Sequence, residues 1–241
     1  MIFKSQVLTQ ASGSVGGVTY SHNAGGMYQR ARTIPTNPQS GFQTQVRNAM
    51  TELVNAWTEI LTPAQRAGWD LYASNVPTTN ALGDPINLSG QNWYIGVNTP
   101  LLQAVSKFTS ALARIDSASG IFDRGDFTDP VPAWTETSGL SMTFDNTDAW
   151  ANEDNAAMFV FQGRPQNASR NFFKGPFRIV GAIEGDAVTA PTSPFTVTAF
   201  ILGLSGFPVL ENEAIWTGIS VIRADGRISS RRIYGPDLAG A

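Results

Sequence analysis

The chain contains no cysteine and only one histidine, His22, among its 241 residues. Without thiols it can form no disulfide, no cysteine nucleophile and no Cys-ligated metal site, and one imidazole is too few for an ordinary zinc site. We therefore expect no catalytic residues, no metal and no cofactor, and the chain is predicted not to be an enzyme. His22 lies beside glycines and far from any acid-rich segment, so we interpret it as a turn or interface residue.

Charged residues are also scarce, at 15% of the chain with a net charge of -3. This composition lacks the basic field that nonspecific binding to nucleic acid usually requires, so a nucleic-acid partner is not expected. Arginine nevertheless outnumbers lysine 13 to 3, and the planar donor group of arginine suits interfaces between proteins. The predicted interface residues are Tyr20, Tyr28, Arg30, Arg32 and Arg47, which we expect to contact an acidic protein neighbour.

Long hydrophobic runs are absent as well. No stretch approaches the roughly 18 apolar residues of a membrane span, and the first residues lack the basic and apolar pattern of a signal peptide. We expect a soluble protein that is not exported by a signal peptide and has no membrane partner.

The strongest periodic signal in the chain lies between residues 37 and 76. Apolar residues there recur at intervals of four, three, four and three, which places them on one face of an α-helix. These residues are Val46, Met50, Leu53, Trp57 and Ile60. The pattern predicts one amphipathic helix that buries this face against a partner.

A second helix is predicted to begin at Thr62-Pro63-Ala64-Gln65, because this tetrapeptide has the residues of a capping box with proline at the first helical position. Ser89 could cap a third helix, interrupted at Pro100 and resumed through Leu101 to Phe108. We expect three tryptophans to form the small helical core: Trp57, Trp69 and Trp93. Large aromatic side chains bury the most area per residue, which helps so short a bundle to hold together.

The first 41 residues have the composition of an extended arm. It contains six glycines, and two of them, Gly25 and Gly26, lie between the β-prone segments 15–20 and 27–33, which predicts a β-hairpin around residues 23–26. A two-stranded ribbon is marginally stable in water. The arm should therefore lie on the helices of its own chain or add strands to a neighbouring subunit.

From Phe127 onward, short β-prone segments alternate with turn residues. The predicted strands are 140–144, 156–162, 178–183, 195–200, 214–224 and 228–234. Asp225-Gly226 predicts a hairpin between the last two, and apolar residues on both faces of 214–224 indicate a central strand. This spacing favours an immunoglobulin-like or fibronectin III-like β-sandwich, so the fold class is predicted as α+β with parts at 1–41, 42–122 and 123–241.

Two other constellations allow alternative functions. Acidic residues recur in two groups that could ligate Ca²⁺ but lack the EF-hand spacing, so we favour solvated loop acids. They are Asp123, Asp126 and Asp129, then Asp145, Asp148, Glu153 and Asp154.

Three tryptophans of the β part, Trp134, Trp150 and Trp216, are the predicted surface aromatics of a carbohydrate- or receptor-binding module.

A series of short motifs between residues 10 and 98 resembles a family of phage and prophage virion-associated proteins. The motifs occur in this order: Ser12-Gly13-Ser14-Val15-Gly16-Gly17-Val18-Thr19-Tyr20-Ser21, Gly26, Tyr28, Arg30, Arg32, Pro35-Thr36-Asn37-Pro38-Gln39, Gln45, Arg47, Trp57, Leu61-Thr62-Pro63-Ala64-Gln65-Arg66 and Trp69. The resemblance implies a structural component of a tailed-phage particle, assembled in the host cytoplasm, and it carries no catalytic residues.

We expect first a capsid decoration or cement protein, whose arm and helices bind the major capsid protein or other virion proteins and which forms homo-oligomers in the particle. A tail, collar or head–tail connector component is the alternative within the same class. The carbohydrate- or receptor-binding module is the alternative from another class.

Overall fold

The computed structural model describes residues 12–23, 26–34, 36–79, 84–108, 110–197 and 206–240. Its contacts divide the chain into two units, Met1–Ser40 and Gly41–Ala241. Helices and antiparallel sheets occur together, so the predicted α+β class is confirmed. The division at 1–41, 42–122 and 123–241 stays a prediction, and in the structure the helices share a hydrophobic core with strands of the β part.

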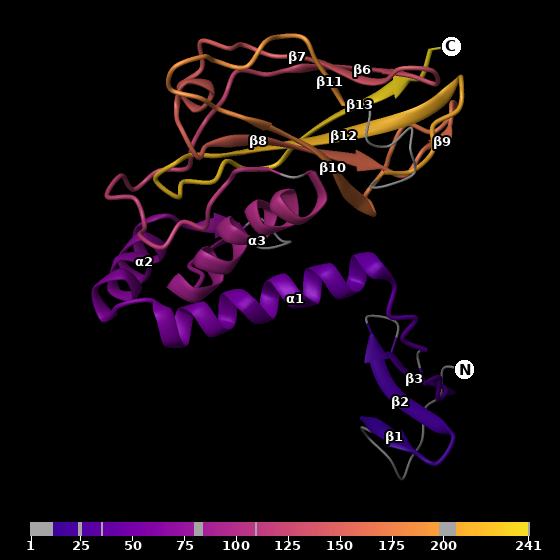
Figure 1. Ribbon diagram of the computed structural model, residues 1–241. Coiled ribbons are helices and arrows are strands. Elements are labelled where there is room, and N and C mark those ends of the chain that lie inside the picture. The colour runs from indigo at the N-terminus through magenta and orange to yellow at the C-terminus, as the bar shows by residue number, and fades with distance from the viewer. Residues whose placement is uncertain are drawn as a thin grey trace. The chain divides into compact units, whose positions relative to one another are not determined.

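The first unit is a small antiparallel sheet of three strands in the order β1-β2-β3 (Figure 1). The strands are β1 Gly13–Val15, β2 Val18–Asn23 and β3 Gly26–Ala31. The predicted hairpin is confirmed as β2 and β3. The predicted strand over 15–20 is wrong at its start, because a turn at Gly16, where φ is +59°, separates β1 from β2.

The first helix, α1 Gly41–Asn55, continues into a π-helical turn, η1 Ala56–Ile60. The predicted buried face is confirmed for Leu53 and, half-buried, for Trp57, but it is wrong for Val46, Met50 and Ile60, which are exposed. The side chains that α1 and η1 bury are Ala49, Leu53 and Ala56. Two of these three are alanines, and α1 packs against α3. Small side chains allow two helix backbones to approach closely, so the seam follows the alanines instead of the larger apolar residues.

The second helix, α2 Pro63–Asn75, begins with the predicted capping box, which is confirmed. The Thr62 backbone N–H donates to Gln65 Oε1 at 2.9 Å, and the Gln65 backbone N–H donates to Thr62 Oγ1 at 3.3 Å. These bonds satisfy donors that the first turn of a helix otherwise leaves free.

The third helix, α3 Gly90–Phe108, begins after Ser89, whose Oγ accepts a hydrogen bond from the Asn92 backbone N–H at 3.2 Å. The predicted interruption at Pro100 is wrong, because the helix runs through it. Proline cannot donate the hydrogen bond that Gly96 O would accept. Burial of the apolar face around it, including Val97 and Leu101, holds the helix together despite this loss.

The β part contains two sheets. The larger has the order β10-β8-β12-β13, with β9 paired to β12, and the smaller has the order β11-β7-β6. Their strands are β6 Val131–Thr135, β7 Gly139–Thr143, β8 Ala157–Gly163, β9 Gln166–Asn167, β10 Phe177–Glu184, β11 Phe195–Val197, β12 Glu213–Ile222 and β13 Arg232–Leu238. Shorter elements are β4 Thr78–Thr79 paired with β5 Pro85–Ile86, and the 3₁₀ turn η2 Ala149–Asn152.

The strand predictions hold for most of this part. The β12 strand lies between β8 and β13, and residues 214–222 are all buried, which confirms the predicted central strand. The predicted hairpin at Asp225-Gly226 is also confirmed, with the Arg223 N–H donating to Arg227 O at 2.9 Å and Gly226 at φ +89°. The prediction missed β6, and residues 198–200 of the predicted strand 195–200 lie outside the described residues.

The larger sheet has a core on each of its faces. On one face, Phe159 and Phe161 join a core with Leu53, Trp69 and Leu101 of the helices. On the other face, residues of β8 and β12 share a core with the smaller sheet, including Trp134, Leu140, Met158 and Ile219. Adjacent β8 residues belong to different cores because side chains alternate along a strand. Figure 1 shows the resulting layers, with α2 and α3 on one side of β8, β10 and β12, and with β6, β7 and β11 on the other.

The helical core contains the tryptophans named from the sequence. Trp69 and Trp93 are buried, and Trp57 lies half-buried against them. The Trp69 indole N–H donates to Asp116 O at 3.0 Å, and the ring of Trp57 lies 5.6 Å from that of Tyr94. Aromatic rings that touch at an angle are attractive beyond their buried area. The two contacts therefore help to fix η1 against α3 and α2 against the segment after α3.

Candidate functional site

The predicted interface residues lie on several surfaces. Tyr20 is in β2, Tyr28 and Arg30 are in β3, Arg32 follows β3, and Arg47 lies in α1 of the second unit. In the register of the sheet, Ser21 is opposite Tyr28 and Thr19 is opposite Arg30, whereas Tyr20 is opposite Gln29. Since side chains alternate along a strand, Tyr28 and Arg30 share one face of the sheet. Tyr20 lies on the other.

The Tyr20 face of this sheet is the more apolar one. Val15 pairs with Val18, so both lie on this face with Tyr20. Val15 is 74% exposed, and no residue of Met1–Ser40 whose burial the structure describes is buried. A small sheet needs a covered hydrophobic face for independent stability. Among the described residues, Val15 and Val18 thus form an apolar pair on one face of this sheet, and Val15 is its exposed member.

The acidic residues considered as calcium ligands bind arginines or neighbouring loop groups instead. Asp123 accepts from Arg227 Nη1 at 2.7 Å, and Asp129 accepts from Arg232 Nη1 at 2.7 Å. Two further pairs join Asp126 to Arg232 and Glu153 to Arg223. Within the described ranges, no group of three His, Cys, Asp or Glu side chains could hold a metal ion. These pairs connect segment 123–129 and Glu153 to the β12–β13 hairpin.

The remaining acids of the second group accept hydrogen bonds from loop residues, one within a local turn and two across the chain. Asp145 accepts hydrogen bonds from the backbone and hydroxyl groups of Thr147, and Asp148 accepts bonds from those of Thr128. The bonds from Thr147 hold the pKa of Asp145 below its ordinary value. Asp154 accepts from the Ala187 backbone N–H at 2.9 Å.

The predicted platform of surface tryptophans is wrong. Trp134, Trp150 and Trp216 are buried, with exposed fractions of 3%, 0% and 4%. Trp134 and Trp150 lie in the core between the two sheets, and Trp216 stacks on Phe173 at 5.4 Å between ring centroids. These side chains cannot form a sugar-binding surface. His22 lies exposed on β2.

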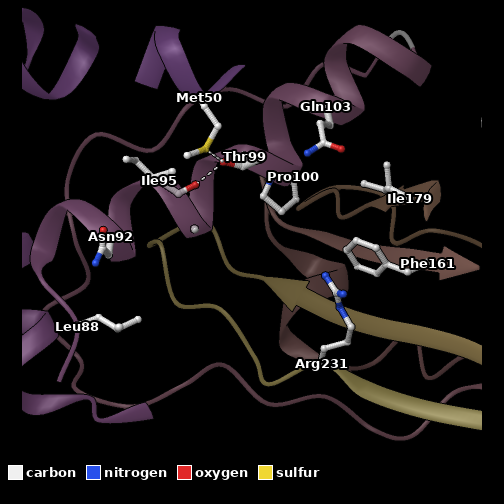
Figure 2. Close-up of a pocket in the computed structure, with 11 residues that line it drawn as sticks. Met50, Leu88, Asn92, Ile95, Thr99, Pro100, Gln103, Phe161, Ile179 and Arg231 are labelled. Carbon is white, nitrogen blue, oxygen red and sulfur yellow. Dashed lines mark hydrogen bonds between the residues drawn. The ribbon is translucent and has the colours of Figure 1, made fainter. Parts of the chain in front are cut away.

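A pocket of about 500 Å³ lies between α3 and the larger sheet, with Met50 of α1 at its edge (Figure 2). Its wall is mostly apolar and comes from both layers: Met50, Leu88, Ile95, Pro100, Phe161 and Ile179. Asn92, Thr99, Gln103 and Arg231 add polar groups to the wall. Sequence reasoning missed this pocket because its residues form no motif. Pro100 inside a helix was the only local irregularity that could have drawn attention to it.

Arg231 is the charged side chain of the pocket. Its guanidinium carbon lies 3.8 Å from the centroid of the Phe161 ring, and its methylene groups cross Gly218, where an added Cβ would lie 3.2 Å from Arg231 Cδ. The residue as a whole is exposed, yet this packing removes water from part of the guanidinium and lowers its pKa. Because Gly218 has no side chain, the side chain of Arg231 can lie against the sheet at this position.

No protein-family model, no curated protein and no solved structure matches this chain. Among the residues that the structure describes, each helix is too short or too polar to cross a lipid bilayer. The function is therefore argued from the motifs of the sequence and from the geometry of the two units.

Proposed function

We propose that this chain is a structural protein of a tailed-phage particle and that its N-terminal sheet attaches it to another protein of that particle. The observation that carries the proposal is the apolar pair of Val15 and Val18 on one face of this sheet, where Val15 is 74% exposed. Extended segments of this kind bind by covering an apolar face or by adding strands to a partner sheet.

Within this class, a capsid decoration or cement protein is the function we favour. The motifs that resemble phage and prophage virion proteins fall on the N-terminal sheet, α1, η1 and α2. The partner would then be the major capsid protein, and copies of this chain would cover the shell. We also propose that the two packed sheets form an immunoglobulin-like or fibronectin III-like β-sandwich.

A tail, collar or head–tail connector component is the second candidate, because the same motifs support any part of the particle. The carbohydrate-binding alternative was based on Trp134, Trp150 and Trp216 as surface residues. All three are buried, so these residues do not support it.

The position in the particle can be measured directly. Tailed-phage particles from the source of this sequence would be purified, their protein content quantified by mass spectrometry, and the chain located with a specific antibody fragment by electron microscopy. Label spread over the whole shell supports a cement protein, and label in a ring at the tail axis supports the second candidate. Particles that lack the chain would refute both.

A further inference from the structure

Four arginines lie at residues 223–232, and one of them has no anionic partner within the part of the chain that the structure describes. Arg223, Arg227 and Arg232 each form an ion pair with a carboxylate. Arg231 has neither a carboxylate nor a carbonyl acceptor among the described residues, and its described contacts are with Phe161 and Gly218. A guanidinium that packing has partly removed from water is stabilised by an anion, which it binds with two parallel hydrogen bonds.

The surroundings of Arg231 define what kind of anion fits. Pro100 and Ile95 of α3 form one wall of the pocket, and Phe161 and Ile179 of the sheet form another. Figure 2 shows the guanidinium of Arg231 beside Phe161 and turned toward Pro100. A volume of about 500 Å³ lies within the usual range for small-molecule sites, which combine apolar walls with a few polar groups.

We propose that this pocket binds an aliphatic monocarboxylate, with the carboxylate on Arg231 and the hydrocarbon chain between Pro100, Phe161 and Ile179. A single cation matches a single negative charge, whereas a phosphate dianion is better matched by two cations than by the one in this lining. The apolar walls favour an alkyl chain over a sugar. All residues that line the pocket belong to the second unit, Gly41–Ala241.

The proposal predicts how affinity depends on the ligand. Each methylene group added between butanoate and octanoate should tighten binding about fourfold, because each buries more apolar surface. Hexan-1-ol has the chain without the charge and should bind at least roughly tenfold more weakly than hexanoate, since it cannot form the charge-assisted pair with Arg231. Hexylamine should bind more weakly still.

The test is a methyl NMR titration of the full chain with these five probes: butanoate, hexanoate, octanoate, hexan-1-ol and hexylamine. Hexanoate should shift the methyl signals of Met50, Ile95 and Ile179 and leave that of Ile183, which lies in the core between the two sheets. Equal binding of hexanoate and hexan-1-ol, or shifts elsewhere only, would overturn the proposal.

Two variants with the same change in net charge complete the test. Arg231→Gln should weaken hexanoate binding at least roughly tenfold, whereas Arg164→Gln, at an exposed arginine outside the pocket, should leave it unchanged. A folded Arg231→Gln protein that binds hexanoate like the original chain contradicts the proposal. If that variant does not fold, the comparison of hexanoate with hexan-1-ol on the original chain decides. Either failure leaves the particle proposal standing, because that proposal rests on the N-terminal sheet.

Discussion

Replacement of Asn98 by leucine should destabilise the second unit strongly, although the two side chains have similar size. Asn98 lies on α3 and is fully buried. Its Oδ1 accepts from the Ile115 backbone N–H at 2.7 Å, and its Nδ2 donates to Ile115 O at 3.0 Å and to Tyr94 O at 3.0 Å. One side chain thus satisfies both backbone groups of Ile115 and holds the segment after α3 against the helix.

The expected loss can be worked out from these bonds. In Asn98→Leu the N–H and C=O of Ile115 would stay buried without partners, at about 1–3 kcal/mol each. Burial of the leucine side chain returns about 1.5 kcal/mol or more. The net loss in the free energy of unfolding should therefore be about 0.5–4.5 kcal/mol, and we expect a value near the middle of this range.

Urea unfolding followed by tryptophan fluorescence and by circular dichroism measures this loss. Asn92→Leu is the matched control, because Asn92 is an exposed asparagine on the same helix, and it should change the free energy of unfolding by less than about 0.5 kcal/mol. The reasoning fails if Asn98→Leu is as stable as Asn92→Leu with an unchanged m-value.

Three further predictions concern stability. Thr62→Ala removes the capping box of α2 and should cost about 1 kcal/mol, measured by thermal unfolding against Thr51→Ala in the middle of α1; equal melting temperatures would contradict it. Tyr72→Phe removes the hydrogen bond from Tyr72 Oη to Asp123 O at 2.7 Å and should cost about 1 kcal/mol in urea unfolding; an unchanged midpoint would refute it. Burial, with a smaller contribution from Arg178, lowers the pKa of Lys107 from 10.5 to about 8. The unfolded chain therefore binds more protons between these values, so the free energy of unfolding should rise with pH from about 8 toward 10.5. Lys107→Met should reduce that rise, and parallel pH curves for the two proteins would exclude this cause.

Local chemistry made part of the fold predictable. The capping box at Thr62 and Gln65 depends on four adjacent residues, so the start of α2 can be read from the sequence. The β-prone runs that form β8 and β10, and the turn at Gly226, each depend on residues that are close together in the chain. These elements were therefore predicted with small errors at their ends.

Features that depend on distant residues were not predictable. Val46 and Met50 share a helical period with Leu53, and only the approach of α3 shows that Ala49 is buried beside Leu53 while Val46 and Met50 stay exposed. Pro100 breaks an isolated helix but not one whose apolar face is buried on a sheet.

The candidate sites show the same limit. The apolar character of Val15, Val18 and Tyr20 is visible in the sequence, but their common face depends on the turn at Gly16. Nothing in the sequence around Arg231 distinguishes it from Arg232, whose carboxylate partners lie about a hundred residues away along the chain. Only the folded structure shows that Arg231 lacks such a partner in the described ranges.

The central claim is that the apolar face of the N-terminal sheet attaches this chain to another virion protein. Cosedimentation of the full chain with phage particles assembled without it tests this claim most directly, with Val18→Asp on the apolar face and Ser21→Asp on the opposite face of the same strand. The account predicts that the original chain and Ser21→Asp bind the particles and that Val18→Asp does not. Binding of Val18→Asp equal to that of the original chain, or no binding of the original chain, would contradict it.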